Sequence, residues 1–404
     1  MSRKIVVVGA GHSTGQLVSS LRQKGFDGRI IAIGDEPYPP YQRPPLSKKF
    51  LAGELSLERI YFKPAAFYTE NDIELRLDTQ VTAIDRQTKS VSCADGSTLD
   101  YDDLVLATGT RVRHLHLPGS DLAGLHYLRN IDDVLNIQAD IAKQRRLLII
   151  GAGYIGLEVA AVTVQRGLEV TVVETENRVL SRVVSPQLSE FYQQEHAAHG
   201  VKFLLGASAG RFSGEQRVQE VELADGRRIP ADMVIIGVGV VPNSELASDA
   251  GLAVDNGIVV DEYCRTADPH IYAIGDCTMH PNSLLGRSLR LESVHNALEQ
   301  AKTAAANLLG EDIRYSQVPW FWSDQYDLKL QIAGLSQGYD QTVTRGDPGS
   351  RSFSCLYLRD GKLLAIDAVN SPRDFMQAKP LIAAGVRPDI DALRNTAIAL
   401  KDLA

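Results

Sequence analysis

Cysteine is scarce in this sequence, and the few cysteines are far apart. The 404 residues include four of them, Cys93, Cys264, Cys277 and Cys355. No pair has the C-x-x-C or C-x4-C spacing of zinc sites, iron–sulfur clusters and redox-active disulfides. The spacing therefore argues against a zinc site, an iron–sulfur cluster or a redox-active disulfide formed by this chain.

The sequence also lacks a net positive charge and a convincing membrane-spanning segment. The formal net charge is -8 at pH 7, and nothing in it suggests nucleic-acid binding. The apolar stretch 147–164 has the length of a membrane span, but its Gly151-Ala-Gly153 centre fits a buried strand-to-helix turn much better. Arg3-Lys4 leads straight into a strand pattern without a cleavable apolar segment, which favours the cytoplasm. We expect neither a nucleic-acid nor a membrane partner.

A glycine-rich turn between a strand and a helix stands near the N-terminus. The apolar run 5–8 precedes Gly9-Ala-Gly11-His-Ser-Thr-Gly15, and a helical pattern that Gly25 ends comes next. Gly9 permits the tight turn, and Gly11 lets the backbone approach a pyrophosphate at the positive end of the helix. Asp35, at the end of the following strand, can accept hydrogen bonds from an adenosine ribose. The unit predicts a dinucleotide site.

One position in this turn departs from the usual G-x-G-x-x-G/A pattern. Thr14 occupies the place of the third small residue, and the glycine is displaced to Gly15. That place normally serves close packing between helix and strand. We therefore expect a local change in packing and no loss of the cofactor.

A proline-rich loop, residues 36–49, follows Asp35. Its prolines disfavour a helix at its start and keep the loop stiff. Arg43 and Lys48 bring two cations to this loop, where phosphates or a flavin could use them. A solvated loop is the alternative interpretation, but the neighbouring dinucleotide unit favours a functional one.

The opening pattern recurs in the middle of the chain, where it is complete. The apolar run 146–150 leads to Gly151-Ala-Gly153-Tyr-Ile-Gly156, a helix, and a strand that ends at Glu174. Two such units predict two nucleotides, a donor and an acceptor of electrons. The Glu174 carboxylate suits the free 2′-hydroxyl of NAD and would repel the 2′-phosphate of NADP, so NADH is favoured. Arg178 and Arg182 follow nearby and weigh against that preference.

Other single residues are candidate site residues because of their position in the sequence. Glu158 lies just beyond the second glycine loop, where burial would require a partner, and Lys48 is a candidate. Asp276 follows a strand and Gly275, where an extended ribityl or phosphate group could bind. A helix that opens near Glu292 could point its N-terminus at the electron-rich edge of a flavin. The segment 319–326 contains both tryptophans, whose usual fate is core packing.

With these segments placed, the chain resembles the FAD-dependent, NADH-using ferredoxin reductases that serve bacterial cytochrome P450 and Rieske dioxygenase systems. The resemblance covers nearly the whole chain in order and is carried by Gly9-Ala-Gly11, Gly34-Asp35, Arg43-Pro-Pro-Leu-Ser-Lys48, Leu104-Val-Leu-Ala-Thr-Gly109, Tyr127-Leu-Arg129, Gly151 to Glu158, Gly275-Asp-Cys277, Glu292-Ser-Val294, Asn296-Ala-Leu-Glu-Gln300 and Trp320-Phe-Trp322-Ser-Asp-Gln-Tyr326. The proline-rich motif and the tryptophan motif are specific to this branch. The glycine loops are common to many flavoenzymes.

The resemblance implies a glutathione-reductase-like α/β fold with two Rossmann-type dinucleotide-binding domains and a C-terminal α+β domain. We expect an FAD domain in two parts, residues 1–112 and 241–316, an NAD domain at 113–240 and the C-terminal domain at 317–404. The expected FAD contacts are Gly9, Gly11, Ser13, Asp35, Arg43, Lys48, Val81, Arg129, Asp276, Val294 and Trp320. The expected NAD contacts are Gly151, Gly153, Gly156 and Glu174.

The resemblance also implies a reaction. NADH would pass a hydride to FAD, and the electrons would leave one at a time to a [2Fe–2S] ferredoxin that supplies a cytochrome P450 or a Rieske oxygenase. Lys48 and Glu158 would form a pair near the flavin N5, and Trp320 would lie close to the flavin. We expect these three residues to carry the chemistry, without a protein nucleophile or a metal.

Three other functions share the fold or the cofactors. A disulfide reductase needs paired cysteines beside the flavin, and an NADH oxidase or peroxidase typically has one redox cysteine there. Residues 38–51 contain no cysteine, which disfavours these enzymes. A redox-sensing flavoprotein with an interaction role is disfavoured by the lack of targeting and basic interaction segments.

Overall fold

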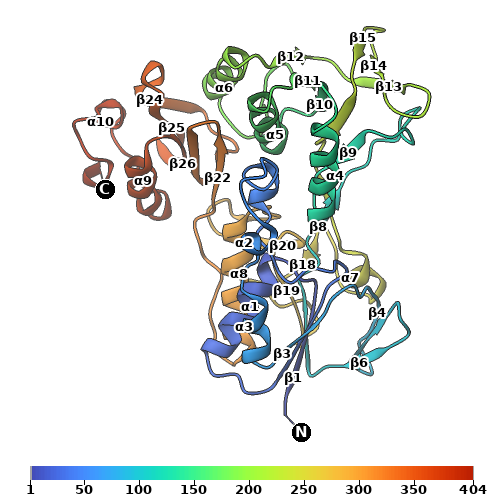
Figure 1. Ribbon diagram of the computed structural model, residues 1–404. Coiled ribbons are helices and arrows are strands. Elements are labelled where there is room, and N and C mark those ends of the chain that lie inside the picture. Colours follow the sequence, from blue (N-terminus) through green and yellow to red (C-terminus); the bar gives the residue numbers. More distant parts are fainter. Residues whose placement is uncertain (1, 404) are drawn as a thin grey trace. The chain divides into compact units, whose positions relative to one another are not determined.

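The chain divides into two compact units. The computed structural model describes residues 2–403, and Figure 1 shows the course of the chain through them. Unit 1 consists of the chain up to Arg43, Ser56–Arg111 and Val240–Gln317. Unit 2 consists of Pro44–Leu55, Val112–Gly239 and the chain from Val318 onward. None of the helices within 2–403 combines the length and the apolarity that crossing a lipid bilayer requires.

Unit 1 is built on a parallel five-stranded sheet in the order β19-β7-β1-β2-β3. Its strands are β1 (Lys4–Val8), β2 (Arg29–Ile33), β3 (Ile73–Arg76), β7 (Asp103–Leu106) and β19 (Ile271–Ala273). Side chains alternate between the faces of a strand. Accordingly, Ile5 and Val7 join one apolar cluster, and Val6 and Val8 join another. Both faces are buried, which explains why these strands are continuous apolar runs in the sequence.

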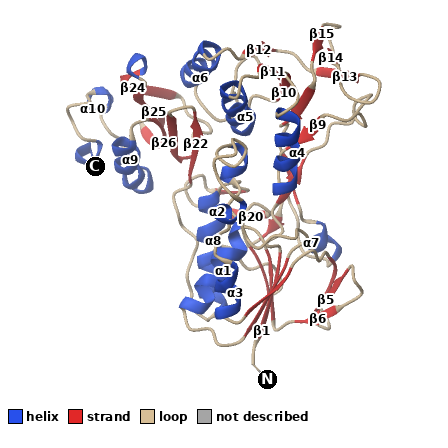
Figure 2. Cartoon of the chain, in the orientation of Figure 1, coloured by secondary structure: helices blue, strands red, loops and turns tan. Residues whose placement is uncertain are grey.

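Helices cover one face of this sheet, and a small antiparallel sheet covers the other (Figure 2). On the helical face, α1 (His12–Gln23) packs against α8 (Val294–Leu308), with α3 (Ala65–Glu70) beside the sheet. On the opposite face lie β4 (Val81–Asp85), β5 (Ser90–Cys93), β6 (Thr98–Asp100) and α7 (Glu245–Asp249). The other elements here are α2 (Leu57–Ile60), β8 (Thr110–Val112), β17 (Val240–Pro242), β18 (Ile258–Val259), β20 (Thr278–Asn282) and β21 (Arg287–Leu289).

The first part of unit 2 repeats this design. Its parallel sheet has the order β12-β11-β10-β16-β9, and a three-stranded antiparallel sheet, β13-β14-β15, packs on one face. The strands are β9 (Leu125–Tyr127), β10 (Arg146–Ile150), β11 (Glu169–Glu174), β12 (Lys202–Leu205), β13 (Ala209–Ser213), β14 (Glu220–Leu223), β15 (Arg228–Pro230) and β16 (Met233–Ile236). The helices are η1 (Pro44–Ser47), α4 (Ile131–Ile141), α5 (Tyr154–Gln165) and α6 (Pro186–Ala198). The glycine motif therefore recurs together with the parallel five-stranded sheet that surrounds it.

The C-terminal part of unit 2 is an antiparallel five-stranded sheet with helices. The order is β22-β23-β26-β25-β24. The elements are β22 (Trp320–Gln325), β23 (Leu328–Gly334), β24 (Gln341–Asp347), η2 (Pro348–Ser350), β25 (Ser352–Arg359), β26 (Lys362–Val369), α9 (Pro372–Ala384), α10 (Ile390–Arg394) and η3 (Leu400–Leu403). The sequence pattern predicts strands near residues 329–333, 341–344, 353–358 and 362–369, and these are β23, β24, β25 and β26. It did not predict β22, the edge strand formed by the tryptophan segment.

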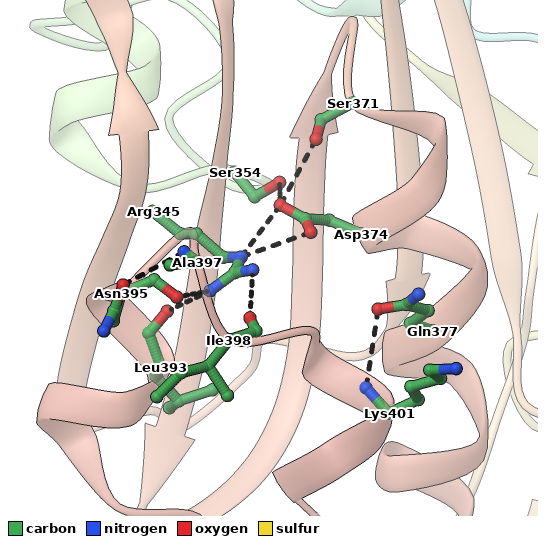
Figure 3. A network of polar contacts seen from close by, with 10 residues as sticks. All are labelled: Arg345, Ser354, Ser371, Asp374, Gln377, Leu393, Asn395, Ala397, Ile398 and Lys401. Atoms are coloured by element: carbon green, nitrogen blue, oxygen red, sulfur yellow. Dashed lines mark hydrogen bonds and ion pairs between the residues drawn. The ribbon is translucent and has the colours of Figure 1, made fainter.

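A buried arginine fastens the C-terminal segment to this sheet (Figure 3). The Arg345 guanidinium donates to the carbonyl oxygens of Asn395 and Ile398, at 2.7 Å each. It also forms an ion pair with Asp374 of α9 at 3.2 Å, and its side chain is 4% exposed. A planar guanidinium can serve several acceptors in fixed directions, which an ammonium group cannot. Arg345 therefore joins β24, α9 and the chain after α10.

We expect Arg345→Lys to loosen the C-terminal segment. Lysine keeps the charge but leaves most of these acceptors without a donor, so the free energy of unfolding should fall by about 3 kcal/mol. Hydrogen exchange followed by mass spectrometry should show faster exchange in residues 390–403. Arg359→Lys, at an exposed position of β25, serves as the matched control. Unchanged exchange in Arg345→Lys would contradict the role given to this arginine.

A buried carboxyl group lies in the same sheet. Asp367 of β26 is 1% exposed and accepts a hydrogen bond from the Tyr357 hydroxyl. That hydroxyl in turn accepts one from the backbone N–H of Ser185, at 2.8 Å. Burial raises the pKa of Asp367 to about 7. The folded protein therefore keeps a proton on Asp367 at a pH where the unfolded chain has lost it.

This raised pKa predicts a pH dependence of stability. Between about pH 4 and about pH 7 the folded state binds one proton more than the unfolded state at Asp367, so stability falls by about 1.4 kcal/mol per pH unit as the pH rises. The contribution is complete below this window and lost above it. In urea unfolding, the free energy of unfolding of the wild type relative to that of Asp367→Asn should fall as the pH rises to about 7 and then stay constant. Parallel curves would show that Asp367 titrates normally.

Candidate functional site

The first glycine loop requires glycine for steric reasons. Gly9 has φ +110°, and a Cβ atom there would lie 2.2 Å from the carbonyl oxygen of Ala107. Gly11 is the N-cap of α1, without a side-chain cap, and a Cβ there would meet nothing within 4 Å. The N-terminal N–H groups of α1 thus face open space that a phosphate can enter, which is the geometry of an anion site.

The departure at Thr14 has a local explanation. Thr14 is fully buried, and its hydroxyl donates to the carbonyl oxygen of Gly9 at 2.6 Å. The displaced Gly15 lies against the ring of Phe62, which a Cβ atom would approach to 2.6 Å. The packing of the first turn therefore differs from the usual pattern, as predicted, while α1 still begins directly after Gly11.

The second glycine loop has the standard geometry. Gly151 has φ +104°, and a Cβ atom on Gly156 would lie 2.2 Å from the Gly151 carbonyl oxygen. Gly153 is the N-cap of α5, and a Cβ there would meet nothing within 4 Å. This loop therefore offers the same kind of open helix end as the first.

Glu174 is held against this loop. Its Oε2 accepts a hydrogen bond from the backbone N–H of Ala152 at 2.7 Å, and its Oε1 accepts one from the N–H of Glu176 at 3.0 Å. Arg178 turns away to its own loop, where it donates to the carbonyl oxygens of Ser181 and Val184. The acidic group next to the loop is thus fixed, and Arg178, one of the two arginines that weighed against NAD, is engaged elsewhere.

Unit 1 brings several predicted flavin residues close to the first loop. A Cβ atom on Gly275 would lie 2.4 Å from Ser13 Oγ, so the turn at Asp276 adjoins the first residues of α1. Val294 is the first residue of α8. Arg43 forms an ion pair with Glu36 at 2.8 Å.

Asp35 and Val81 lie just after the end of β2 and at the start of β4, respectively. Asp35 is exposed, and Val81 is buried. The N–H of Thr79 donates to the carbonyl oxygen of Gly34 at 2.8 Å, which ties the start of β4 to the end of β2.

Unit 2 contains the other predicted flavin residues. Lys48 Nζ lies 2.7 Å from Glu158 Oε2, which gives Glu158 the partner that the sequence suggested. Glu158 is 4% exposed. Arg129 immediately precedes the N-cap of α4, and its backbone N–H donates to Asp133 at 2.8 Å. Trp320, at the start of β22, has the Lys379 ammonium 5.6 Å from its ring centre.

Two residues of the Glu158 site were missed by the sequence reasoning. The Ser47 hydroxyl donates to Glu158 Oε2 at 2.5 Å, and the Ser323 hydroxyl donates to Oε1 at 2.6 Å. Three donors therefore compensate for the burial of this carboxylate. Both serines stand inside motifs that the sequence had singled out, but nothing in those motifs indicates which side chains point toward Glu158.

The glycine loops, the helix ends and the acids that follow the strands define a dinucleotide-binding oxidoreductase. The chain belongs to the pyridine nucleotide-disulphide oxidoreductase family, which matches residues 3–301, and the family described as reductase C-terminal matches residues 320–404. Despite the family name, all four cysteines are buried and unpaired.

Individual relatives are similar over almost their whole length. A ferredoxin–NAD(P)(+) reductase of Sphingomonas sp is 45% identical, with 94% of this chain and 92% of that protein aligned. The crystal structure of the ferredoxin reductase for the CYP199A2 system from Rhodopseudomonas palustris has a TM-score of 0.97 and 40% identity, covering 99% of this chain and 100% of that one. The reductase in the covalent putidaredoxin reductase–putidaredoxin complex has a TM-score of 0.96 and 42% identity, covering 99% and 98%.

The second loop predicts a contrast between two alanine substitutions. Gly156→Ala should lower the free energy of unfolding by about 1–3 kcal/mol, because its Cβ would collide with the backbone at Gly151. Gly153→Ala should change it by less than about 0.5 kcal/mol, because φ there is -77° and the space is open. Thermal unfolding without nucleotide measures both. Equal effects would contradict the packing described for this loop.

Proposed function

We propose that this chain is an NADH-dependent ferredoxin reductase. With bound FAD it takes a hydride from NADH and passes the electrons singly to a [2Fe–2S] ferredoxin that supplies a cytochrome P450 or a Rieske-type oxygenase. The observation that carries the proposal is the pairing of two open glycine loops with a buried Lys48–Glu158 pair. The relatives named as ferredoxin reductases, one of them in a complex with putidaredoxin, support the choice of acceptor.

The two glycine loops divide the cofactors between them. We assign FAD to residues 1–112 and 241–316 and NAD to residues 113–240, and residues 317–404 form the C-terminal α+β domain. The residues that we propose to hold FAD are Gly9, Gly11, Ser13, Asp35, Arg43, Lys48, Val81, Arg129, Asp276, Val294 and Trp320. NAD is held by Gly151, Gly153, Gly156 and Glu174. The open helix ends at Gly11 and Gly153 and the tied carboxylate of Glu174 support this division.

FAD supplies the chemistry that the side chains lack, because it accepts two electrons together and releases them one at a time. The protein contributes position and charge. Lys48 would offer its ammonium group to the bound flavin, and Glu158 holds that group in one place. Since the pair is neutral overall, the ammonium can be kept in a buried site at a moderate cost.

The thiols offer no alternative route for electrons. All four are buried, and burial raises the pKa of Cys355 to about 11 and the pKa of Cys264 and Cys277 above its ordinary value. A thiolate is the reactive form in disulfide and peroxide chemistry. This supports an electron-transfer function over a disulfide reductase or a peroxidase. Free thiols also support a cytoplasmic location, which we propose on that ground.

The acceptor is tested by NADH oxidation in air by the FAD-loaded protein. Cytochrome c reduction is followed with and without a [2Fe–2S] ferredoxin from the same organism. We expect strong stimulation that saturates with ferredoxin, because the one-electron acceptor is the protein partner. Fast oxidation that ignores ferredoxin would make oxygen or a small molecule the acceptor, and the proposal would fall.

The role of Lys48 is tested by Lys48→Met in rapid-mixing experiments with NADH. Loss of a charge aimed at the reacting atoms should slow flavin reduction on the order of 100-fold. Lys49→Met removes the neighbouring exposed lysine and is the matched control, with an unchanged rate. An unchanged rate in Lys48→Met would remove Lys48 from the mechanism.

A further inference from the structure

A line of buried hydrogen bonds extends from Glu158 away from Lys48. Ser323 Oγ donates to Glu158 Oε1 at 2.6 Å, and Gln325 Nε2 donates to Ser323 Oγ at 3.1 Å. Gln325 Oε1 lies 2.8 Å from His196 Nε2, and the Tyr326 hydroxyl lies 2.9 Å from His196 Nδ1. Ser323, Gln325 and His196 are each at most 1% exposed, whereas Tyr326 reaches the surface in part. We call Ser323, Gln325, His196 and Tyr326 the β22 chain.

The Glu158 carboxylate fixes the direction of the first three bonds, those of Ser323, Gln325 and His196. The Glu158 carboxylate only accepts, so the Ser323 hydroxyl must donate to it. Ser323 then accepts from the amide nitrogen of Gln325, which leaves the amide oxygen to face His196. His196 must therefore carry its proton on Nε2.

The charge state of His196 completes this order. Burial lowers the pKa of His196 to about 4, so the ring is neutral at pH 7. A neutral imidazole that donates through Nε2 accepts at Nδ1, and the Tyr326 hydroxyl donates there. All four donors therefore point toward Glu158, and hydrogen bonds aligned in this way polarise one another.

The β22 chain is suited to positioning and unsuited to proton transport. The Gln325 amide cannot pass a proton onward without becoming an imidic acid. Its two ends are a fixed donor and a fixed acceptor, so it transmits orientation only. The chain can therefore hold the carboxylate of Glu158 in one rotamer.

The alternation of β22 explains why the motif has these residues. Phe321, Ser323 and Gln325 occupy alternate positions of the strand, and they face Tyr154 and Glu158 of α5 and His196 of α6, respectively. Trp320 lies on the other face, where its ring packs against Phe375 of α9. One face of the tryptophan motif thus contacts α5, the helix that follows the second glycine loop, and α6.

We propose that Ser323, Gln325, His196 and Tyr326 are positioning residues of the reductase, which hold Glu158 and through it the ammonium group of Lys48. The proposal rests on the function proposed above, because it gives Lys48 its task. This role explains why the tryptophan motif contains Ser323, Gln325 and Tyr326, which neither flavin contact nor core packing explains.

Coupling to Lys48 is measured by a double-mutant cycle with Ser323→Ala and Lys48→Met. Ser323→Ala should slow flavin reduction on the order of 10-fold, but by less than about twofold when Lys48 is already methionine. Ser354→Ala is the matched control. Ser354 is a buried serine of the same sheet as Ser323, but its hydroxyl donates to Asp374 of α9. Loss by the same factor in both backgrounds would mean a merely structural role and would overturn the proposal.

The bond directions have a readout that does not involve the flavin. Nitrogen-15 spectra of histidine-labelled protein, with the His196 signal identified by its loss in His196→Asn, should show a neutral ring protonated on Nε2 at pH 7. Gln325→Glu places a carboxylate against Nε2, so the His196 ring should become charged. A ring protonated on Nδ1 in the wild type, or unchanged by Gln325→Glu, would overturn the proposed direction.

The two measurements separate the failure of this proposal from the failure of the proposed function. If Lys48→Met leaves flavin reduction unchanged while the His196 spectra are as expected, the task assigned to Lys48 is wrong, and the hydrogen-bond directions of the β22 chain are confirmed. If Lys48→Met slows reduction but Tyr326→Phe, Ser323→Ala and Gln325→Met all leave the rate unchanged, the positioning role is wrong and the function stands.

Discussion

The buried carboxylate of Glu158 is the interaction on which unit 2 depends most. An ionised carboxylate is costly to bury unless its oxygens accept hydrogen bonds, and here donors from two other segments provide them. Lys48 and Ser47 come from the proline-rich loop, Glu158 from the helix after the second glycine loop, and Ser323 from the C-terminal sheet. The same contacts that make the burial tolerable therefore fasten these segments together and fix the ammonium group that we assign to the flavin.

The two glycine loops impose the second constraint, and the chain meets it in two ways. At the second loop, Gly156 avoids a collision with Gly151. At the first loop, the equivalent residue is Thr14, whose hydroxyl bonds to the carbonyl of Gly9, and Gly15 makes room for Phe62 instead. In both cases the helix begins at an uncapped glycine, so the N–H groups remain available for a phosphate. The two loops therefore share the open helix end, and they do not share the third glycine.

The sequence was most informative where the physical cause is local. Strand, turn and helix follow one another within about thirty residues in each glycine unit, so order and spacing alone predicted both, and β10 and β11 repeat the pairing of β1 and β2. The alternating strands of the C-terminal sheet were also predictable. The strand β22 was not, because its aromatic residues fit a core segment equally well.

Contacts between distant residues lay beyond this reasoning. Lys48 was suspected as the partner of Glu158 because a buried carboxylate needs one and because the family resemblance pairs the two residues. Ser323 and His196 carry no signal at all, since a serine and a histidine are ordinary at such positions, and their partners are more than 100 residues away in the sequence. The same holds for Arg345, whose acceptors are backbone carbonyls that any residue provides. Short-range pattern gives the cofactor loops, whereas long-range polar contacts complete the site.

A crystal structure of the FAD-loaded protein would test the central claim most directly. The account predicts that Lys48 Nζ lies within hydrogen-bond distance of the flavin N5, about 3.5 Å or less, with Glu158 on its other side. It also predicts that the β22 chain is unbroken in that state. A lysine turned away from the flavin, or a different side chain at N5, would contradict the account.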